Sequence, residues 1–252
     1  MLRHLFLFLT TAMALSAATR RAEPSLPVAA PATPPPDTLT AGVFPPGPTV
    51  LKGATRDLAD LDIRLVTLPP GQTFHLANDS ADHLLIVKDG DINFESTKQT
   101  LGPGGIGLFA ALDKPVLHNT AGTNASFYLL AFKSRSGSNQ AATPFIRDWP
   151  DLPMKKTDKG ESRAIFSQPT AWLKNINMHA TTLDPGEISH PQHVHRAEEI
   201  LLLRSGEVRM HIANGYIPAK GGDLVFLPSG VPHDLENGPT GRTEYFALQW
   251  EP

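Results

Sequence analysis

The sequence predicts an all-β chain built from two tandem barrels, and three observations support this fold class. Strand-length apolar runs such as LDIRLVTL and SFYLLAFK are rich in β-branched or aromatic residues and are separated by Gly, Pro, Asn and Asp. No stretch repeats its apolar residues at a long helical period. The same succession of apolar runs and turn residues also occurs twice in the same order, which indicates an internal duplication.

The duplication is carried by three pairs of matching segments that lie about 115 residues apart. The pairs are Leu61–Gly71 with Ile176–Gly186, His83–Gly90 with Glu199–Gly206, and Ser126–Lys133 with Thr243–Trp250. Two copies of short strands joined by Gly/Pro turns fit paired β-barrels or jelly rolls. We expect one barrel over residues 50–133, a linker over 134–160 and a second barrel over 161–252.

The first 18 residues predict an export signal. Arg3 gives a short basic start, the apolar run LFLFLTTAMALSA follows, and the small residues Ser16–Ala18 suit a cleavage site. The apolar run is shorter than the about 20 residues that span a bilayer. We therefore expect an exported protein, periplasmic or secreted, without a stable membrane anchor. The alternative is an N-terminal strand or helix of a cytosolic protein.

Residues 19–49 form a proline-rich segment. Proline fixes φ and lacks an amide donor, so this segment is expected to be extended, with little helix or central strand. Two roles are open for it: a tether after the signal, which we prefer, or an arm laid over the folded part of the chain.

Composition limits the classes of partner and of site. The formal net charge is −3 and no long basic run occurs, so nothing predicts a nucleic-acid partner or an anionic membrane surface. The chain has no cysteine, which excludes disulfides, thiolate metal ligands and a lipid anchor on an N-terminal cysteine.

Three histidines and one glutamate in the second copy predict a metal site. His193 and His195 point the same way on a strand, because side chains alternate between its faces. Glu199 keeps the same parity, and His233 follows a Pro-Ser-Gly turn on a later strand. Imidazole and carboxylate ligands suit Fe, Mn, Zn, Ni or Cu. Three neutral histidines and one carboxylate leave a divalent ion with a net charge of about +1, and an octahedral ion would keep two open positions.

The spacing of these residues resembles the two motifs of the cupin superfamily. Gly186 to Gly206 reads G-x6-H-x-H-x3-E-x6-G, which has one residue more before the first histidine than the first cupin motif. Gly222 to Asn237 reads G-x5-P-x-G-x2-H-x3-N, which matches the second motif throughout. The resemblance implies two tandem cupin barrels (double-stranded β-helix or RmlC-like jelly roll). It also implies that the metal ligands are His193, His195, Glu199 and His233.

The first copy departs from both motifs. His83 stands where the glutamate is expected, and Ala77 and Asp79 stand where the two histidines are expected. Ala111 and Asp113 replace the proline and glycine of the second motif.

Two interpretations of the first copy follow. The preferred one is that this barrel has lost its metal and serves as a packing partner or a binding lid. The alternative is an altered site made from His75, Asp79, His83 and His118, the last of which lies near the expected histidine. On the preferred interpretation the chain resembles bicupins with one working barrel, the C-terminal one.

Four residues near the predicted ligands carry weaker expectations. His190 is either a pocket residue beside the ligand pair or a solvated loop residue, and His211 has a parity that allows it to face the pocket or the surface. Arg196 and Glu198 are expected to face outward as a charge pair.

The predicted function is that of an exported bicupin enzyme acting on an oxygen-bearing small molecule at a mononuclear site. The chemistry would be dioxygenase-, isomerase- or lyase-like, with Fe or Mn preferred as the metal. Oxalate-degrading bicupins would keep both sites, ureidoglycine aminohydrolase-like proteins use another ligand order, and flavonol-dioxygenase-like proteins share only the ligands.

The alternative is a non-catalytic binding or sensor protein. An acid or base in the pocket would favour the enzyme, and a wholly apolar or blocked pocket would favour the binder. Homo-oligomerisation is left open.

Overall fold

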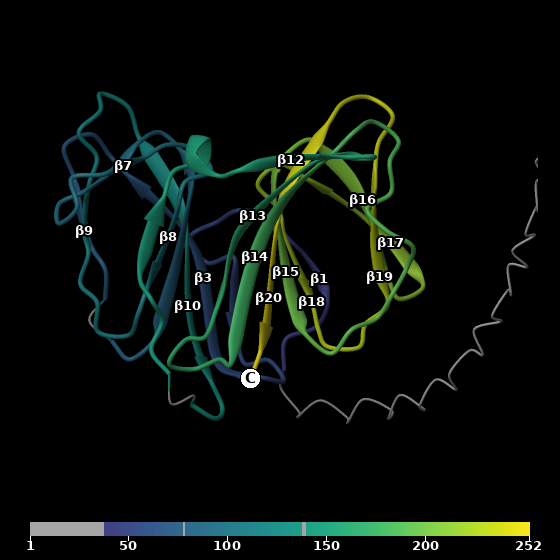
Figure 1. Ribbon diagram of the computed structural model, residues 1–252, viewed down its shortest axis with the longest axis horizontal. Helices are drawn as coiled ribbons and strands as arrows, with labels where there is room; N and C mark the ends of the chain where they lie inside the picture. Colours follow the sequence, from purple (N-terminus) through teal and green to yellow (C-terminus); the bar gives the residue numbers. More distant parts are fainter. Residues whose placement is uncertain (1–37, 78, 138–139) are drawn as a thin grey trace, which may run out of the picture. The chain divides into compact units, whose positions relative to one another are not determined.

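The computed structural model describes residues 38–77, 79–137 and 140–252, and the predicted signal segment at residues 1–18 lies outside them. In this part of the chain the regular structure consists of β-strands and one 3-10 turn, η1 (Trp149–Asp151), without any α-helix. No helix that is long and apolar enough to cross a membrane occurs in the described ranges. The strands form two barrels within the compact unit of residues 32–252, which confirms the predicted fold class (Figure 1).

In the first barrel a six-stranded sheet packs against a four-stranded sheet. The strand orders are β11-β8-β5-β10-β3-β2 and β4-β9-β6-β7, and all pairs are antiparallel. The strands are β2 (Leu51–Gly53), β3 (Leu58–Leu68), β4 (Thr73–His75), β5 (Asp82–Asp89), β6 (Ile92–Phe94), β7 (Thr100–Leu101), β8 (Ile106–Phe109), β9 (Val116–His118), β10 (Ala125–Ser134) and β11 (Phe145–Arg147).

The second barrel repeats this plan with a seven-stranded and a three-stranded sheet. Their orders are β1-β18-β15-β20-β14-β13-β12 and β17-β16-β19. The strands are β1 (Gly42–Phe44), β12 (Met154–Thr157), β13 (Gly160–Gln168), β14 (Asn175–Leu183), β15 (Glu198–Ser205), β16 (Glu207–Ile212), β17 (Gly215–Lys220), β18 (Leu224–Leu227), β19 (His233–Asn237) and β20 (Thr243–Glu251).

The large sheets of the two barrels pack against each other, and this explains why the central strands are almost continuously apolar. In β15, Ile200 and Leu202 belong to the core shared by both barrels, whereas Leu201 and Leu203 belong to the interior of the second barrel. A strand that is buried on both faces needs apolar residues at successive positions. β5 divides its residues between the shared core and the interior of the first barrel in the same way.

A matched pair of glycines closes the turn after these strands in each barrel. Gly90 and Gly206 have φ values of 71° and 83°, in the left-handed region that favours glycine. A Cβ at either position would lie less than 3.0 Å from backbone atoms of the adjacent segment of the same barrel. The same turn is therefore built into both copies, as the duplication predicts.

Part of the proline-rich segment is an arm. Strand β1 pairs antiparallel with β18 and so extends the large sheet of the second barrel, although it precedes the first barrel in sequence (Figure 1). Thr38 forms a parallel bridge with Ala54. For the described residues 38–49 the arm therefore replaces the tether that we preferred.

Candidate metal centre

Backbone hydrogen bonds bring the three predicted histidine ligands together. His193 and His233 lie opposite each other, and the N–H of each donates to the carbonyl oxygen of the other, at 3.2 and 3.0 Å. The N–H of Gly230, in the turn before His233, donates to the carbonyl oxygen of His195 at 2.9 Å. As a result, one ring nitrogen from each histidine lies within 4.8 Å of the other two.

Two of the rings are held so that Nε2 faces the centre. Nδ1 of His195 lies 2.8 Å from the carbonyl oxygen of Ala197, and Nδ1 of His233 lies 2.9 Å from that of Val231. A carbonyl only accepts, so Nδ1 carries the proton in both rings and the lone pair is left on Nε2. Such partners fix the orientation of metal-ligating histidines.

Glu199 completes the cluster from the interior face of β15. Its Oε2 lies 3.3 Å from Nε2 of His195 and 3.2 Å from Nε2 of His233, while Nε2 of Gln249 donates to its Oε1 at 3.1 Å. Burial opposes its ionisation, but the interactions with these two histidines and Gln249 outweigh burial and lower the pKa of Glu199 to about 2. The carboxylate is therefore charged at neutral pH.

The electrostatics of the cluster fit a cation. Nε2 of His233 is buried and has no hydrogen-bond partner among the described residues, although Glu199 Oε2 is near it. The hydrogen bond with Glu199 raises the pKa of His195. A proton on Nε2 of His195 can bond to the Glu199 carboxylate, whereas the unprotonated Nε2 would place its lone pair against those of the carboxylate. A metal ion would satisfy the same atoms. The three histidines could hold such an ion. Their imidazole nitrogens suit several divalent metals and do not select one of them.

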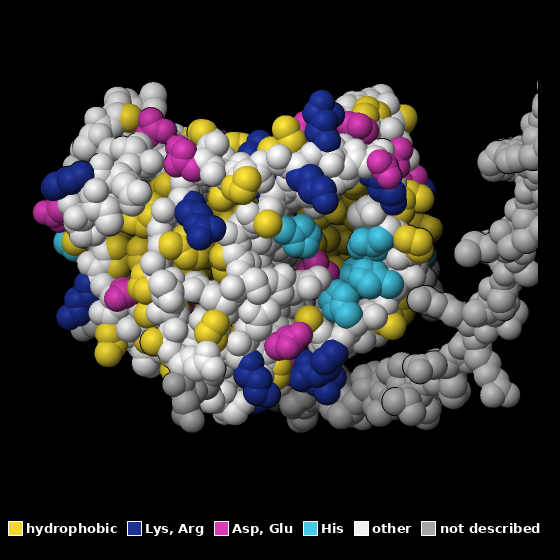
Figure 2. All heavy atoms as spheres, viewed as in Figure 1, with side chains coloured by type: hydrophobic (Ala, Val, Ile, Leu, Met, Phe, Trp, Pro, Cys, Tyr) yellow, Lys and Arg dark blue, Asp and Glu magenta, His cyan; other side chains and the backbone are white. Residues whose placement is uncertain are grey.

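The cluster opens into a cavity of about 230 Å³ inside the second barrel. Figure 2 shows histidine side chains gathered on one face, with an acidic side chain visible between them. The cavity is lined by His179, Thr181, Ser189, His190, His193, Glu199, Leu201, Met210, His233, Asp234, Leu235, Tyr245, Ala247 and Gln249.

His179, Tyr245 and Gln249 are among the cavity residues that had no role in the sequence analysis. They lie on β14 and β20, which pair with each other at the centre of the large sheet. Burial lowers the pKa of His179 and raises the pKa of Tyr245 to about 12, so both side chains are neutral at pH 7. Strand parity could have identified His179, because Met178 and Ala180 on either side of it belong to the core between the barrels.

The two weaker candidates lie in different places. The ring of His190 is 4.1 Å from that of His193 and lines the cavity. Of the positions left open for His211, the structure does not favour the pocket, because its neighbours Met210 and Ile212 take the interior face of β16. Instead, His211 stacks on Tyr216 at 4.3 Å and lies 3.0 Å from the carboxylate of Asp234.

The outward charge pair expected for Arg196 and Glu198 is wrong. Glu198 is 1% exposed and accepts hydrogen bonds from Thr55, from the N–H groups of Arg56 and Asp57 and from Trp250. Its parity on β15 directs it away from the cavity and towards the first barrel. Arg196 does not pair with Glu198 but forms a two-pronged ion pair with Asp57, at 2.7 and 2.9 Å.

The alternative altered site in the first barrel does not form. Asn119 and Asn237 occupy equivalent positions, since each donates from its amide to the carbonyl oxygens of a strand end and of the following turn. Counting back from these residues, His118 corresponds to Glu236, and Pro115 corresponds to His233.

The members of that alternative site also do not form a group of three or more donors close enough to hold a metal. His118 is held by the hydroxyl group of Thr73, His75 is exposed, and His83 is buried 3.6 Å from Asp79. In the described part of the chain, only His193, His195 and His233 form a cluster that could hold a metal.

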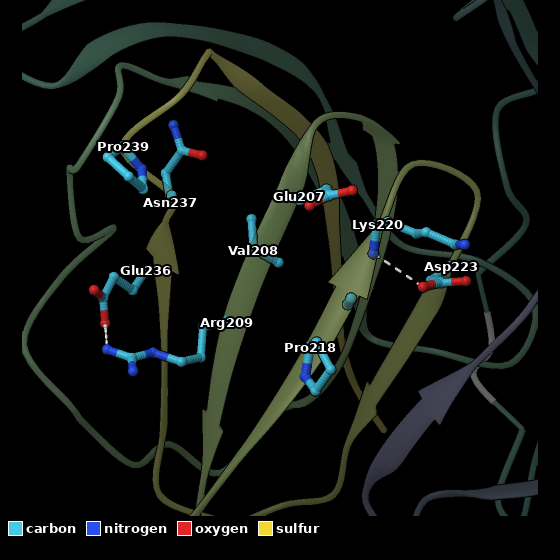
Figure 3. Close-up of a pocket in the computed structure, with 11 residues that line it drawn as sticks. Glu207, Val208, Arg209, Pro218, Lys220, Asp223, Glu236, Asn237 and Pro239 are labelled. Carbon is cyan, nitrogen blue, oxygen red and sulfur yellow. Dashed lines mark hydrogen bonds and ion pairs between the residues drawn. The ribbon is translucent and has the colours of Figure 1, made fainter.

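A larger cavity, of about 630 Å³, lies elsewhere on the second barrel, along β16, β17 and β19 (Figure 3). It contains no histidine. Arg209 pairs with Glu236 there, and Asp223 accepts a hydrogen bond from the N–H of Lys220. Volume alone therefore does not identify the functional site, and the chemistry favours the smaller cavity.

Comparison with known proteins agrees with this geometry. Residues 179–248 match the sequence family Cupin_2, described as a cupin domain. No curated protein matches the sequence.

Three solved structures resemble the fold. A cupin 2 conserved barrel domain protein from Leptotrichia buccalis gives a TM-score of 0.55 at 15% identity, with 85% of this chain and 90% of that chain covered. A variant of oxalate decarboxylase from Bacillus subtilis gives 0.63 at 13% identity, with 85% and 78% covered. A further structure of that enzyme, described by its Mn(II) centres, gives 0.61 at 12% identity, with 84% and 75% covered. At these identities the likeness shows the fold alone.

Proposed function

We propose that the second barrel, whose residues 179–248 match the Cupin_2 family, is a metal-dependent enzyme site for a small oxygen-bearing molecule. The proposed ligands are His193, His195, Glu199 and His233. The orphaned Nε2 of His233 and the orientation of the two rings through their Nδ1 atoms support this set. Fe or Mn is the proposed metal, on the basis of the nitrogen and oxygen donors.

The metal, when bound, would supply Lewis acidity and open positions for an oxygen-bearing substrate. The protein's own residues would perform the remaining tasks. Gln249 holds Oε1 of Glu199 and so fixes the direction of the carboxylate. The Tyr245 hydroxyl group, which bonds to Thr181 and Ser189, offers a neutral hydrogen-bonding group on the same wall.

One observation carries the enzyme interpretation over the binding alternative: His179 lies in the cavity as a neutral imidazole. No hydrogen bond to its ring is found among the described residues, and burial lowers its pKa. A neutral imidazole can accept or donate a proton at pH 7. We assign to His179 the transfer of a proton to or from the bound molecule, as isomerase- or lyase-like chemistry requires.

The first test concerns the metal. Wild-type protein and a His193→Ala/His195→Ala variant are purified in parallel and their metal content is measured by elemental analysis. We expect close to one metal ion per wild-type chain and almost none in the variant. Equal metal content in both would contradict the proposed site.

The second test concerns catalysis. Metal-loaded wild type and His179→Gln are compared for turnover of small carboxylates, diketones and phenolics. We expect turnover in the wild type and a loss of about 100-fold or more in the variant, with metal content unchanged. Ligand-induced stabilisation without turnover in either protein would favour the non-catalytic binding protein.

Export is also proposed, on the pattern of residues 1–18. The protein should lose these residues when it is produced in a host with a secretory pathway. Mass spectrometry of the purified chain checks this, and an intact N-terminus in exported protein would contradict the signal assignment.

A further inference from the structure

The distribution of charge in the cavity of about 230 Å³ carries an inference about its ligand, which rests on the proposed function. We infer that the site takes a small, singly charged molecule with two adjacent oxygen donors, of the 2-hydroxy or 2-oxo monocarboxylate class, and excludes a second anionic group away from the metal. The argument depends on size, on the charge at the ligand cluster and on the two walls.

The size of the cavity limits the ligand to a few carbon atoms. Sites for drug-sized molecules usually enclose about 300–1,000 Å³. The cavity here, at about 230 Å³, is smaller than this range, and its lining includes His193, Glu199 and His233.

The charge at the cluster favours one negative charge. Three neutral imidazoles and one carboxylate around a divalent ion would leave a net charge of about +1. A monoanion that binds through two of its oxygens would neutralise this charge. A carboxylate next to a hydroxyl or carbonyl group has the required pair of donors.

The side chains that line the rest of the cavity include no permanent cation for a second negative charge. No Lys or Arg is among the described residues that line it, and its other acid, Asp234, is engaged by His211. His179 and Tyr245 are neutral at pH 7, because burial lowers the pKa of the first and raises that of the second. A distal carboxylate would therefore lose its hydration without gaining a cation.

The two walls are also suited to a short ligand with an apolar end. The small sheet contributes Met210 and Leu235, both of which are almost fully buried. The large sheet contributes His179, Thr181 and Tyr245, which can bond to oxygens close to the metal. A ligand would therefore place its oxygens at the cluster and its carbon chain between the sheets.

The experiment uses two probes that share the same metal-binding end. 2-Hydroxybutanoate and malate both have four carbons and a 2-hydroxy carboxylate, but malate has a second carboxylate in place of the terminal methyl group. Each is titrated by calorimetry into full-length protein loaded with Zn²⁺, which has no redox chemistry. We expect the affinity for 2-hydroxybutanoate to be at least about tenfold higher than the affinity for malate.

A variant adds the missing cation. His190→Lys places an ammonium group at the cavity lining on a loop position that is not fully buried. We expect it to tighten malate about tenfold and to leave 2-hydroxybutanoate nearly unchanged.

The outcomes separate the two proposals. Malate that binds as tightly as 2-hydroxybutanoate to the wild type, or a zinc-loaded protein that binds neither, would overturn the inference while the metal site stands. A protein that fails to bind Zn²⁺ would overturn the proposed function itself, and the inference with it.

Discussion

The carboxylate of Glu199 is constrained at both oxygens, and this defines the site at the scale of single residues. Oε1 accepts a hydrogen bond from Gln249, while Oε2 faces the Nε2 atoms of His195 and His233. A group buried in this way is positioned for a ligand before the ligand arrives. Its partner Gln249 should therefore influence metal affinity without being a ligand itself.

Replacement of Gln249 tests this role. We expect Gln249→Leu to lower the affinity for Zn²⁺ about 10–100-fold, because outer partners of metal ligands contribute on this order. Competition with a chelator of known affinity measures the change. Gln168→Leu is the control. Gln168 lies on strand β13, next to the edge strand β12, and its replacement should leave the affinity for Zn²⁺ unchanged. An unchanged affinity in Gln249→Leu would remove the positioning role.

The pair formed by His195 and Glu199 predicts how stability depends on pH in the metal-free protein. The pKa of Glu199 is about 2 in the folded chain, below the unfolded value of about 4.3. Its contribution is therefore present above about pH 4.3 and is lost as pH falls towards 2. The pKa of His195 is raised, so its contribution is present below about pH 6.5 and is lost as pH rises through the folded value.

The pair should therefore stabilise the metal-free protein most between about pH 4.5 and 6.5. Denaturant unfolding of wild type and Glu199→Gln at several pH values, in the presence of a chelator, gives the difference in the free energy of unfolding. We expect this difference to peak near pH 5–6 and to shrink at pH 3 and pH 9. A difference that is constant over this range would contradict the assignment.

At the scale of elements, strand β15 serves both barrels. Glu199 faces the cavity, and Glu198 faces the loop that joins β2 to β3 of the first barrel. Glu198 accepts hydrogen bonds from backbone and side-chain donors of that loop, and Arg196 holds Asp57 of the same loop. The chain between His195 and Glu199, the second and third predicted ligands, is therefore bound to the first barrel.

Glu198→Gln should weaken this connection. In the variant, the NH2 group of the glutamine would replace one carboxylate oxygen of Glu198 and would face the hydrogen-bond donors that this oxygen now accepts from. Buried donors without acceptors cost about 1–3 kcal/mol each. We expect the free energy of unfolding to fall by roughly this amount, as measured with denaturant. Glu236→Gln, whose parent side chain is 35% exposed and pairs with Arg209, is the matched control and should change stability by less than about 0.5 kcal/mol. Equal effects of the two substitutions would contradict the proposed connection.

At the scale of the whole described unit, the two barrels share one apolar core. This core contains Leu84 and Leu130 of the first barrel together with Met178, Phe226 and Trp250 of the second. The arm at β1 adds backbone hydrogen bonds from the segment that precedes the first barrel to the sheet of the second. Neither barrel can expose its large sheet without losing a buried apolar face.

The barrels should therefore unfold together. We expect one calorimetric transition whose calorimetric and van't Hoff enthalpies agree. Leu84→Ala in the first barrel and Met178→Ala in the second should each destabilise that single transition by about 2–5 kcal/mol, because each leaves a cavity in the shared core. Two separated transitions, with each substitution shifting only one of them, would contradict this prediction.

Several features of the chain followed from local patterns. Strand texture, turn glycines such as Gly90 and Gly206, and the repeat itself predicted paired all-β barrels, because a strand alternates its side chains with a period of two wherever it lies. The spacing of His193, His195, Glu199 and His233 predicted residues that converge. The structure brings these four side chains together.

Other features depended on how strands pair, which no local pattern contains. His118 looked equivalent to a ligand, but the position of Asn119 shows it to be three residues too late. Glu198 looked like a surface residue, because its sequence neighbours do not reveal that the first barrel covers its side of β15.

The sequence by itself therefore determined the fold class, which arises from strand alternation, and the candidate ligand set, which arises from spacing along the chain. Only the tertiary structure decided what surrounds those ligands. His179 and Gln249 reach the cavity from strands outside the two motifs, and the pairing of β14, β20 and β15 places them in the same cavity as Glu199. That arrangement is a property of sheet register and barrel closure, which exist only when the whole chain has folded.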